Sequence, residues 1–321
     1  MNKERIISVL ILIFFIISLI AASFLVLRVS EEKMARFPRE LKGFSTFSQN
    51  IAIVNVYGPI EIESSNYLGF FPSGADYIVE ELQNLRKNPD VKAVVLRINS
   101  PGGSVGAVQE IYSELLKLKQ SGKKLVASQA EVSASGGYYL AAAADKIVSE
   151  PGAVTGSIGV IIPITNFEGL FGKIGVQVDV VKSGAHKDIG SSSRALTDEE
   201  RKILQDMVDS AYQQFLDAVN KGRSSLMTEE KIKEVADGRI MTGAQAKEVG
   251  LVDELGDLDD AINIAAELAG IKKSDIRIFE EKKDWKKMLL QQIGSKTSNN
   301  PLSSFLPPRT GLLEYRWAPE Y

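Results

Sequence analysis

The chain has 321 residues, of which 44% are hydrophobic and 25% are charged, and its formal net charge is −3. No part of the sequence is strongly basic, which argues against a nucleic-acid-binding protein. The absence of cysteine and the single histidine, His186, exclude cysteine nucleophiles, thiolate zinc sites and two-histidine HExxH sites. We expect neither a metal nor a cofactor, and a Ser-His-Asp triad would have to use His186.

Residues 6–27 form an almost uninterrupted apolar run near the N-terminus. As a helix at about 1.5 Å per residue, this run extends roughly 33 Å, which is enough to cross the hydrocarbon core of a membrane. It therefore predicts a transmembrane helix between a short N-terminus (1–5) and a polar stalk (28–50). A signal peptide that is cleaved near Ala21 or Ser23 is the alternative.

Lysines and arginines flank the apolar run on both sides, so their distribution does not fix its orientation. A very short segment before a first span most simply stays in the cytoplasm. We therefore expect a single-pass protein of the cell membrane whose large domain lies on the extracytoplasmic side.

From residue 51 to residue 150, short runs of β-branched and apolar residues alternate with stretches whose apolar residues recur at helical spacing. Alternating strands and helices are typical of βαβ crossovers and of a largely parallel sheet that helices cover on both faces. The predicted strands are 51–58, 91–99, 124–129 and 146–150, and the predicted helices are 75–86, 107–119 and 138–144.

The second half of the domain has a different character. A further strand is predicted at 176–181, and the following part, 197–270, is mainly helical. Thr197 and Glu200 have the spacing of a capping box at a helix N-terminus. The sequence thus predicts one α/β domain, 51–294, with a helical C-terminal part.

The segment Asn-Ser-Pro-Gly-Gly-Ser (99–104) directly follows a predicted strand and precedes a predicted helix. Gly102 and Gly103 permit backbone geometry that is closed to other residues, and they let a ligand approach the main chain closely. Amide groups at a strand-to-helix turn can donate hydrogen bonds to a developing oxyanion. An ordinary tight turn is the alternative interpretation.

A second strand-to-helix segment, Ser-Ala-Ser-Gly-Gly-Tyr-Tyr (133–139), has Ser135 in the middle of its small residues. A serine in the first turn of a helix lies in a positive backbone potential, and Gly136 beside it leaves room for an acyl group. Serine is also a favoured N-cap that needs no catalytic role. The segment is not a GxSxG nucleophile elbow, because Ser133 stands at its first position.

Two further segments contain side chains of interest. The turn Thr-Gly-Ser-Ile-Gly-Val (155–160) includes Ser157, and the stretch Val-Lys-Ser-Gly-Ala-His-Lys-Asp (181–188) includes Lys182 and Lys187. Taken singly, a lysine in a loop is usually a solvated surface charge, and the serine turn carries no signal of its own.

In this order, the four segments resemble those of the bacterial signal peptide peptidases of the SppA type in their short form, over about residues 50–270. The SPGG turn also occurs in the related Clp proteolytic subunits and crotonases. The resemblance implies a crotonase/Clp-like spiral of ββα units and a membrane-anchored Ser/Lys-dyad endopeptidase that degrades cleaved signal peptides and similar apolar peptides. In the short form, adjacent subunits of a homo-oligomeric ring complete the dyad, one giving the serine and the next the lysine.

The resemblance also implies roles for individual residues. Ser135 is expected to be the nucleophile, rather than Ser133. Lys187 is expected to be the general base, rather than Lys182, and Ser157 is expected to assist that lysine by hydrogen bonding. The expected oxyanion donors are the amides of Gly136 and of Gly102 or Gly103.

His186 has no catalytic position in the family pattern, so the expected base is a lysine. At its ordinary pKa of about 10.4, a lysine is protonated at neutral pH and cannot accept a proton from a serine. Burial in apolar surroundings can lower a lysine pKa by the roughly 3 pH units that are needed. A bound substrate or a neighbouring subunit would supply such burial.

Two other functions fit parts of the sequence. A crotonase-type acyl-CoA enzyme would use the SPGG amides on a thioester enolate, but its acid and base groups are usually carboxylates, and no membrane anchor is expected. A catalytically silent membrane scaffold would keep the fold without the activity. The presence of both Ser135 and Lys187 argues against the scaffold.

The C-terminal segment, 295–321, is rich in serine, asparagine and proline, which favours an irregular tail. Its apolar residues nevertheless make it too apolar for a purely solvated tail. Because a tethered segment is present at high local concentration, we hypothesise that this tail binds the substrate groove and is a self-substrate. The apolar residues concerned are Leu302, Phe305, Leu306, Leu312, Leu313, Tyr315 and Trp317.

Overall fold

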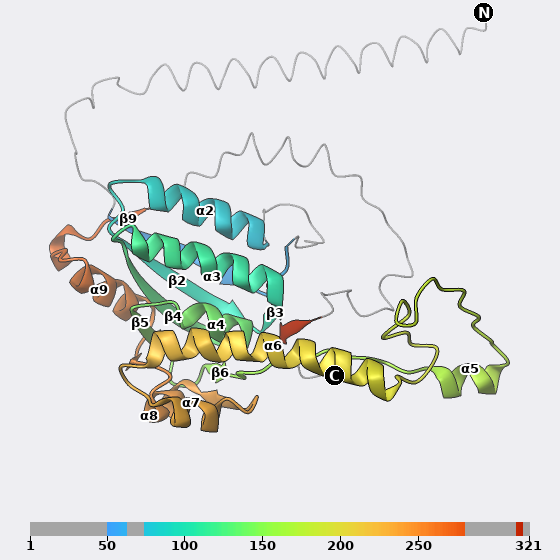
Figure 1. Cartoon of the computed structure of the whole chain (residues 1–321). Helices are drawn as coiled ribbons and strands as arrows, with labels where there is room; N and C mark the ends of the chain where they lie inside the picture. Colours follow the sequence, from blue (N-terminus) through green and yellow to red (C-terminus); the bar gives the residue numbers. More distant parts are fainter. Residues whose placement is uncertain (1–49, 63–73, 280–312, 317–321) are drawn as a thin grey trace, which may run out of the picture. The chain divides into compact units, whose positions relative to one another are not determined.

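The structure is a computed structural model that describes residues 50–62, 74–279 and 313–316 (Figure 1). The predicted anchor, 6–27, and nearly all of the predicted stalk lie outside these residues. Nowhere in the described ranges does a helix combine the length and the apolar composition that a membrane crossing requires.

An eight-stranded sheet forms the centre of the described unit, in the order β7-β6-β4-β2-β1-β9, with β5 paired to β4 and β8 paired to β5. All pairings in this sheet are parallel except the one between β6 and β7. The predicted α/β class with a largely parallel sheet is therefore confirmed. The strands are β1 (Ile51–Tyr57), β2 (Ala93–Ser100), β4 (Lys124–Ala134), β5 (Lys146–Ser149), β6 (Val154–Gly156), β7 (Ile240–Thr242), β8 (Glu254–Leu255) and β9 (Ile278–Phe279).

Alternate residues of each strand point to opposite faces of this sheet. Apolar residues lie on both faces, so helices cover both. Val94 and Leu96 belong to a large core with helices α2 and α3, whereas Ala93 and Val95 pack in a second cluster with α9. The helices are α2 (Ala75–Lys87), α3 (Val105–Gln120), α4 (Gly136–Ala141), α5 (Glu168–Ile174), α6 (Asp198–Arg223), α7 (Glu229–Val235), α8 (Gly243–Val249), α9 (Leu258–Leu268) and the 3-10 turn η1 (Lys273–Asp275).

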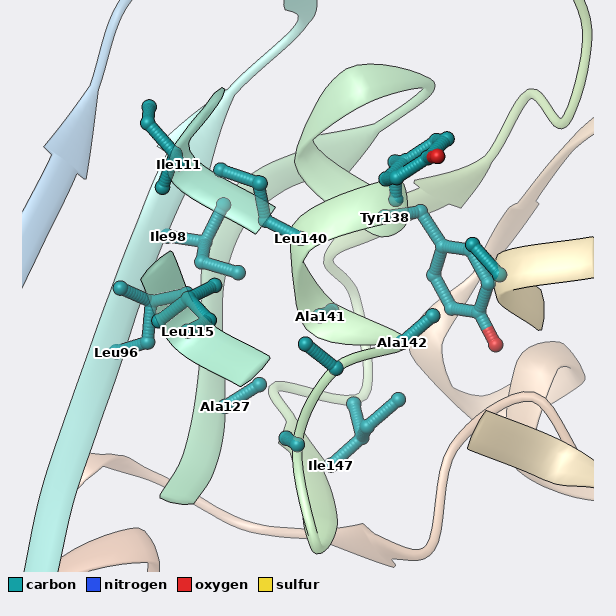
Figure 2. Packing of buried hydrophobic residues seen from close by; sticks show 14 of the residues in the cluster. Leu96, Ile98, Ile111, Leu115, Ala127, Tyr138, Leu140, Ala141, Ala142 and Ile147 are labelled. Carbon is teal, nitrogen blue, oxygen red and sulfur yellow. The ribbon is translucent and has the colours of Figure 1, made fainter. Parts of the chain in front are cut away.

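Close packing around α4 fixes the position of the segment that precedes it. Figure 2 shows Leu140 lying near Ile98 of β2 and Ile111 of α3. Tyr138 of the same helix is fully buried, and its hydroxyl donates a hydrogen bond to the carbonyl of Leu251 at 2.8 Å. Burying a large apolar side chain contributes about 1.5–3 kcal/mol, so this short helix is held mainly by its tertiary contacts.

Helix α6 begins as the sequence predicts. The Glu200 amide donates to the Thr197 hydroxyl at 3.2 Å, and the Thr197 amide donates to the Glu200 carboxylate at 3.0 Å. These reciprocal bonds form the capping box at the helix N-terminus.

The predicted strand at 176–181 is wrong. The structure has no strand there, and the alternating Val176, Val178 and Val180 are each nearly half exposed. A β-branched segment becomes a strand only when a neighbouring strand pairs with it. Within the described residues this segment has no such neighbour, and Figure 1 shows residues 162–197, with α5, extending away from the sheet.

Candidate active site

The register of two parallel strands brings Ser135 and Ser157 together. In the pairing of β4 with β6, Ser133 lies opposite Thr155 and Ala134 lies opposite Gly156. Each serine directly follows the end of its strand, at the same edge of the sheet. Ligands of open α/β sheets bind at this carboxyl edge.

Both serines have an unusual backbone conformation. Ser135 has φ 51° and ψ −114°, and Ser157 has φ 50°; they are the only non-glycine residues with positive φ among those described. The amide of Ser135 donates to the carbonyl of Gly156 at 2.8 Å, and the amide of Ser157 donates to the carbonyl of Arg239 at 2.7 Å. Strained backbone of this kind persists where surrounding structure holds it, and it is concentrated at functional sites.

Ser135 and Ser157 line one pocket with a volume of about 350 Å³. Ser135 is almost completely buried, with 1% of its surface exposed, and Ser157 is 8% exposed. The remaining lining comes from the residues after Ser157, from α6, from the turn before β7 and, for Arg316, from the C-terminal segment. It consists of Ile158, Gly159, Val160, Ile161, Val208, Asp209, Tyr212, Ala236, Asp237, Gly238 and Arg316.

The SPGG glycines lie beside the start of α4. Gly102 has φ +99°, and a Cβ atom built on it would lie 2.7 Å from the amide nitrogen of Gly136. The amide of Gly102 donates to the Ser100 hydroxyl at 3.1 Å. Gly136 is the first residue of α4, where amides have no partner within the helix. The two glycine segments thus come within contact distance.

A short strand from the predicted tail, β10 (Glu314–Arg316), pairs in antiparallel fashion with β3 (Gly102–Ser104). Tyr315 lies opposite Gly103 in this pairing. On the other side of β10, Glu314 exchanges two backbone hydrogen bonds with Ile161, both of 3.1 Å. An extended peptide that pairs with the edge of a strand is the usual arrangement of β-strand addition. For these residues the irregular tail expected from composition is wrong.

The Gly103 amide faces this added strand. Ile60 donates to the carbonyl of Gly102, and Ser104 donates to the carbonyl of Ile60. Because backbone groups alternate sides along a strand, the N–H and C=O of Gly103 point to the opposite side, where Tyr315 lies. The Tyr315 carbonyl oxygen is so close that a Cβ atom on Gly102 would be 1.9 Å from it.

Tyr315 fills a buried aromatic pocket. Its ring centre lies 5.1 Å from that of Tyr139 and 5.0 Å from that of Phe215, and its hydroxyl donates to the carbonyl of Ala211 at 2.9 Å. Its surface is completely buried, and this burial raises the pKa of its hydroxyl above the ordinary range. The pocket therefore accommodates an aromatic side chain with one polar end.

Lys187 is apart from these residues. It is exposed, and it is not among the residues that line the pocket of Ser135. No other described side chain or backbone group pairs with its ammonium group. Lys182 instead pairs with Asp188 at 2.6 Å, and His186 lies 3.6 Å from Glu199. Within one chain, the structure brings together the two serines and the glycines but not the lysine.

The sequence pattern did not predict the aromatic pocket or the strand that fills it. Tyr139 belongs to the SASGGYY segment, and Phe215 belongs to the apolar face of a predicted helix, where both suggest ordinary core residues. The apolar character of the tail was the available signal, but it did not identify which residues of the tail bind.

The chain is similar in sequence to a peptidase family and to several proteins named as proteases. The sequence pattern of peptidase family S49 matches residues 117–272, a range that includes Ser135, Ser157 and Lys187. Three relatives illustrate the similarity. The Synechocystis protein named "Putative protease slr0021" is 48% identical over 186 residues, 58% of this chain and 66% of that protein.

The other two relatives are more distant in sequence. "Putative signal peptide peptidase SppA" of Enterococcus faecium is 39% identical over 216 residues, 67% of this chain and 62% of that protein. "Putative protease MJ0651" of Methanocaldococcus jannaschii is 37% identical over 278 residues, 85% of this chain and 86% of that protein. The chain thus spans less than two thirds of the first two relatives and most of the third.

Proposed function

We propose that the chain, which belongs to the SppA-type members of peptidase family S49, is a serine endopeptidase that uses Ser135 as nucleophile and Lys187 as general base. The observation that carries this proposal is the position of Tyr315. Its carbonyl lies against Gly102 and Gly103, and the next residue, Arg316, lines the pocket of Ser135. A peptide bond is thus held where a serine nucleophile would need it.

The oxyanion donors in this proposal are the amides of Gly103 and Gly136. The Gly102 amide is already used by the Ser100 hydroxyl, whereas that of Gly103 faces the bound strand. We assign Gly102 a different task, which is to let the reacting carbonyl approach without a Cβ atom in its way. Ser157 shares the pocket with Ser135 and would hydrogen-bond the lysine when it enters.

We propose that Lys187 reaches the serine of a neighbouring subunit in a homo-oligomeric ring. Its ammonium group is exposed in a single chain, and a lysine must be desolvated to act as a base near neutral pH. The surrounding segment exposes Leu170, Ile174 and Val181, of which Val181 is entirely exposed. Large exposed apolar patches are typical of interaction surfaces, and we propose that these residues contribute to a subunit contact.

We propose that the domain has a crotonase/Clp-like fold, which is a spiral of ββα units. Strands β2 and β3 followed by α3 form one such unit in chain order. Membership of a peptidase family favours peptide hydrolysis over the acyl-CoA chemistry of crotonases and over a silent scaffold.

We propose that cleaved signal peptides and similar apolar peptides are the substrates, and that residues 6–27 anchor the domain on the extracytoplasmic side of the cell membrane. If so, protease added to cells without their outer envelope layers should degrade the domain. A cytoplasmic marker protein must stay intact as the control. Protection of the domain in sealed cells, with degradation only after lysis, would contradict the orientation.

We further propose that the tail is a self-substrate that is cut between Tyr315 and Arg316. Intact-mass spectrometry should find that the purified wild-type chain ends at Tyr315, whereas Ser135→Ala protein still ends at Tyr321. Tyr315→Asp should be trimmed at least about tenfold more slowly, because a carboxylate cannot be solvated in the aromatic pocket. Identical termini in wild-type and Ser135→Ala protein would rule out self-processing.

A further inference from the structure

Arg194 lies between two carboxylates and binds both of them with two hydrogen bonds each. Its Nε and Nη2 donate to the Asp188 carboxylate at 3.0 and 2.8 Å. Its Nη1 and Nη2 donate to the Glu200 carboxylate at 2.8 and 2.6 Å. Only a guanidinium group can hold two carboxylates in this planar arrangement. We call these three residues the Arg194 clamp.

One end of the clamp is fixed to the helical scaffold. The Glu200 side chain is 2% exposed, and it also closes the capping box of α6 with Thr197. Hydrogen bonds from Arg194 and from the Thr197 backbone lower the pKa of Glu200 to about 2. Glu200 therefore stays ionised at neutral and mildly acidic pH, and its charge is matched by Arg194.

The other end of the clamp is next to Lys187 in the chain. Asp188 is 12% exposed, and its carboxylate binds Lys182 as well as Arg194. The Lys182 ammonium also donates to the carbonyl of Ala185 at 2.8 Å, so the loop from Lys182 to Asp188 is closed on itself. Hydrogen bonds from Arg194 and then Lys182 keep the pKa of Asp188 well below its usual range.

The arrangement leaves one cation of the loop without a partner among the described residues. Lys182 is neutralised by Asp188, whereas the ammonium group of Lys187 is exposed and unpaired there. The backbone around Lys187 is nevertheless defined, since its amide donates to Gly184 at 3.2 Å and the Ile189 amide donates to His186 at 3.1 Å. The backbone of the loop is thus fixed, while the Lys187 side chain is exposed to solvent.

We propose that Arg194 is a positioning residue, which ties the Lys187 loop to α6 so that the lysine is presented in one place to the serine of the adjacent subunit. This inference rests on the proposed Ser135–Lys187 mechanism for its catalytic consequence. A lysine side chain is long and flexible, and holding a base in a productive position is a large part of its catalytic value. Without the clamp, Lys187 keeps its chemistry but loses its fixed location.

The Arg194→Ala variant should therefore lose about 10- to 100-fold in kcat, while KM changes less than about threefold. Arg194→Lys keeps the positive charge but loses the forked guanidinium group, so its kcat should lie between those of the wild type and Arg194→Ala. A matched control is Lys233→Ala, which breaks an exposed ion pair with Glu229 and should leave kcat unchanged.

Subunit mixing separates positioning from general damage. With random exchange at equal amounts, Ser135→Ala and Lys187→Ala protein should restore about a quarter of the junctions of a cyclic ring. Arg194→Ala mixed with Ser135→Ala should restore a similar share, because its serine can meet an intact loop. Arg194→Ala mixed with Lys187→Ala should restore none. Equal recovery in the two mixtures that contain Arg194→Ala would refute the role of Arg194. Recovery in neither of them would also refute it, provided that Ser135→Ala mixed with Lys187→Ala regains activity.

A second measurement does not depend on the ring. Amide hydrogen exchange in residues 184–194 should be about tenfold faster in Arg194→Ala than in the wild type, while exchange in α9 stays the same. Unchanged exchange in this loop would show that Arg194 does not hold it. If the mixture of Ser135→Ala with Lys187→Ala stays inactive after proven subunit exchange, the dyad shared between subunits is wrong. The amide hydrogen exchange measurement then decides alone whether Arg194 fixes the loop.

Discussion

Replacing Ser135 by alanine is expected to reduce peptidase activity at least about 1000-fold without unfolding the protein, and replacing Lys187 by alanine should do the same. Ser135→Ala removes the nucleophile, and Lys187→Ala removes the base that would activate it. The measurement is kcat/KM on an apolar peptide with an aromatic residue before the cleaved bond. Circular dichroism should confirm that both variants remain folded.

The controls for this prediction lie in the same loop as the lysine. His186→Ala should retain nearly all activity, because the one described ion-pair partner of the His186 side chain is the exposed Glu199. Lys182→Ala should retain most activity, because Asp188 keeps its bonds to Arg194. If His186→Ala is as inactive as Ser135→Ala, a histidine base replaces the lysine in the mechanism.

Gly102→Ala should reduce kcat about 100-fold or more, which is the usual effect of damaging an oxyanion site. The added Cβ atom would lie 1.9 Å from the Tyr315 carbonyl oxygen and 2.7 Å from the Gly136 amide nitrogen. Neither atom belongs to a flexible side chain. Gly102 also has φ +99°, which is costly for any residue with a Cβ atom. The same variant should retain its tail, because Tyr315 can no longer lie against the glycines.

Gly106→Ala is the matched control for this prediction. Gly106 lies in the first turn of α3, and a Cβ atom there would meet nothing within 4 Å. Alanine is favoured over glycine in a helix by about 0.5–1 kcal/mol, so this variant should be fully active and slightly more stable. Full activity of Gly102→Ala would exclude close approach of the substrate at this glycine.

Local sequence predicted the elements whose pattern can be recognised from residues a few positions apart. The buried strands β1 and β2, the amphipathic helices α2 and α3, and the start of α6 all lie within a few residues of their predicted positions. Their signals are periodicity and capping, both of which operate over a few residues. The order of the four motif segments was equally visible, and it identified the family.

Contacts between distant parts of the chain were decided only by the tertiary structure. β10 pairs with β3, although more than half of the chain separates them, and nothing local to Tyr315 specifies that Gly103 is its partner. Conversely, the valines of 176–181 have the composition of a strand but find no strand to pair with in the part of the chain that the structure describes. Strand formation depends on a partner that the segment itself does not contain. For the same reason, the sequence singled out Ser135 and Ser157, but only the register of β4 and β6 brings them into one pocket.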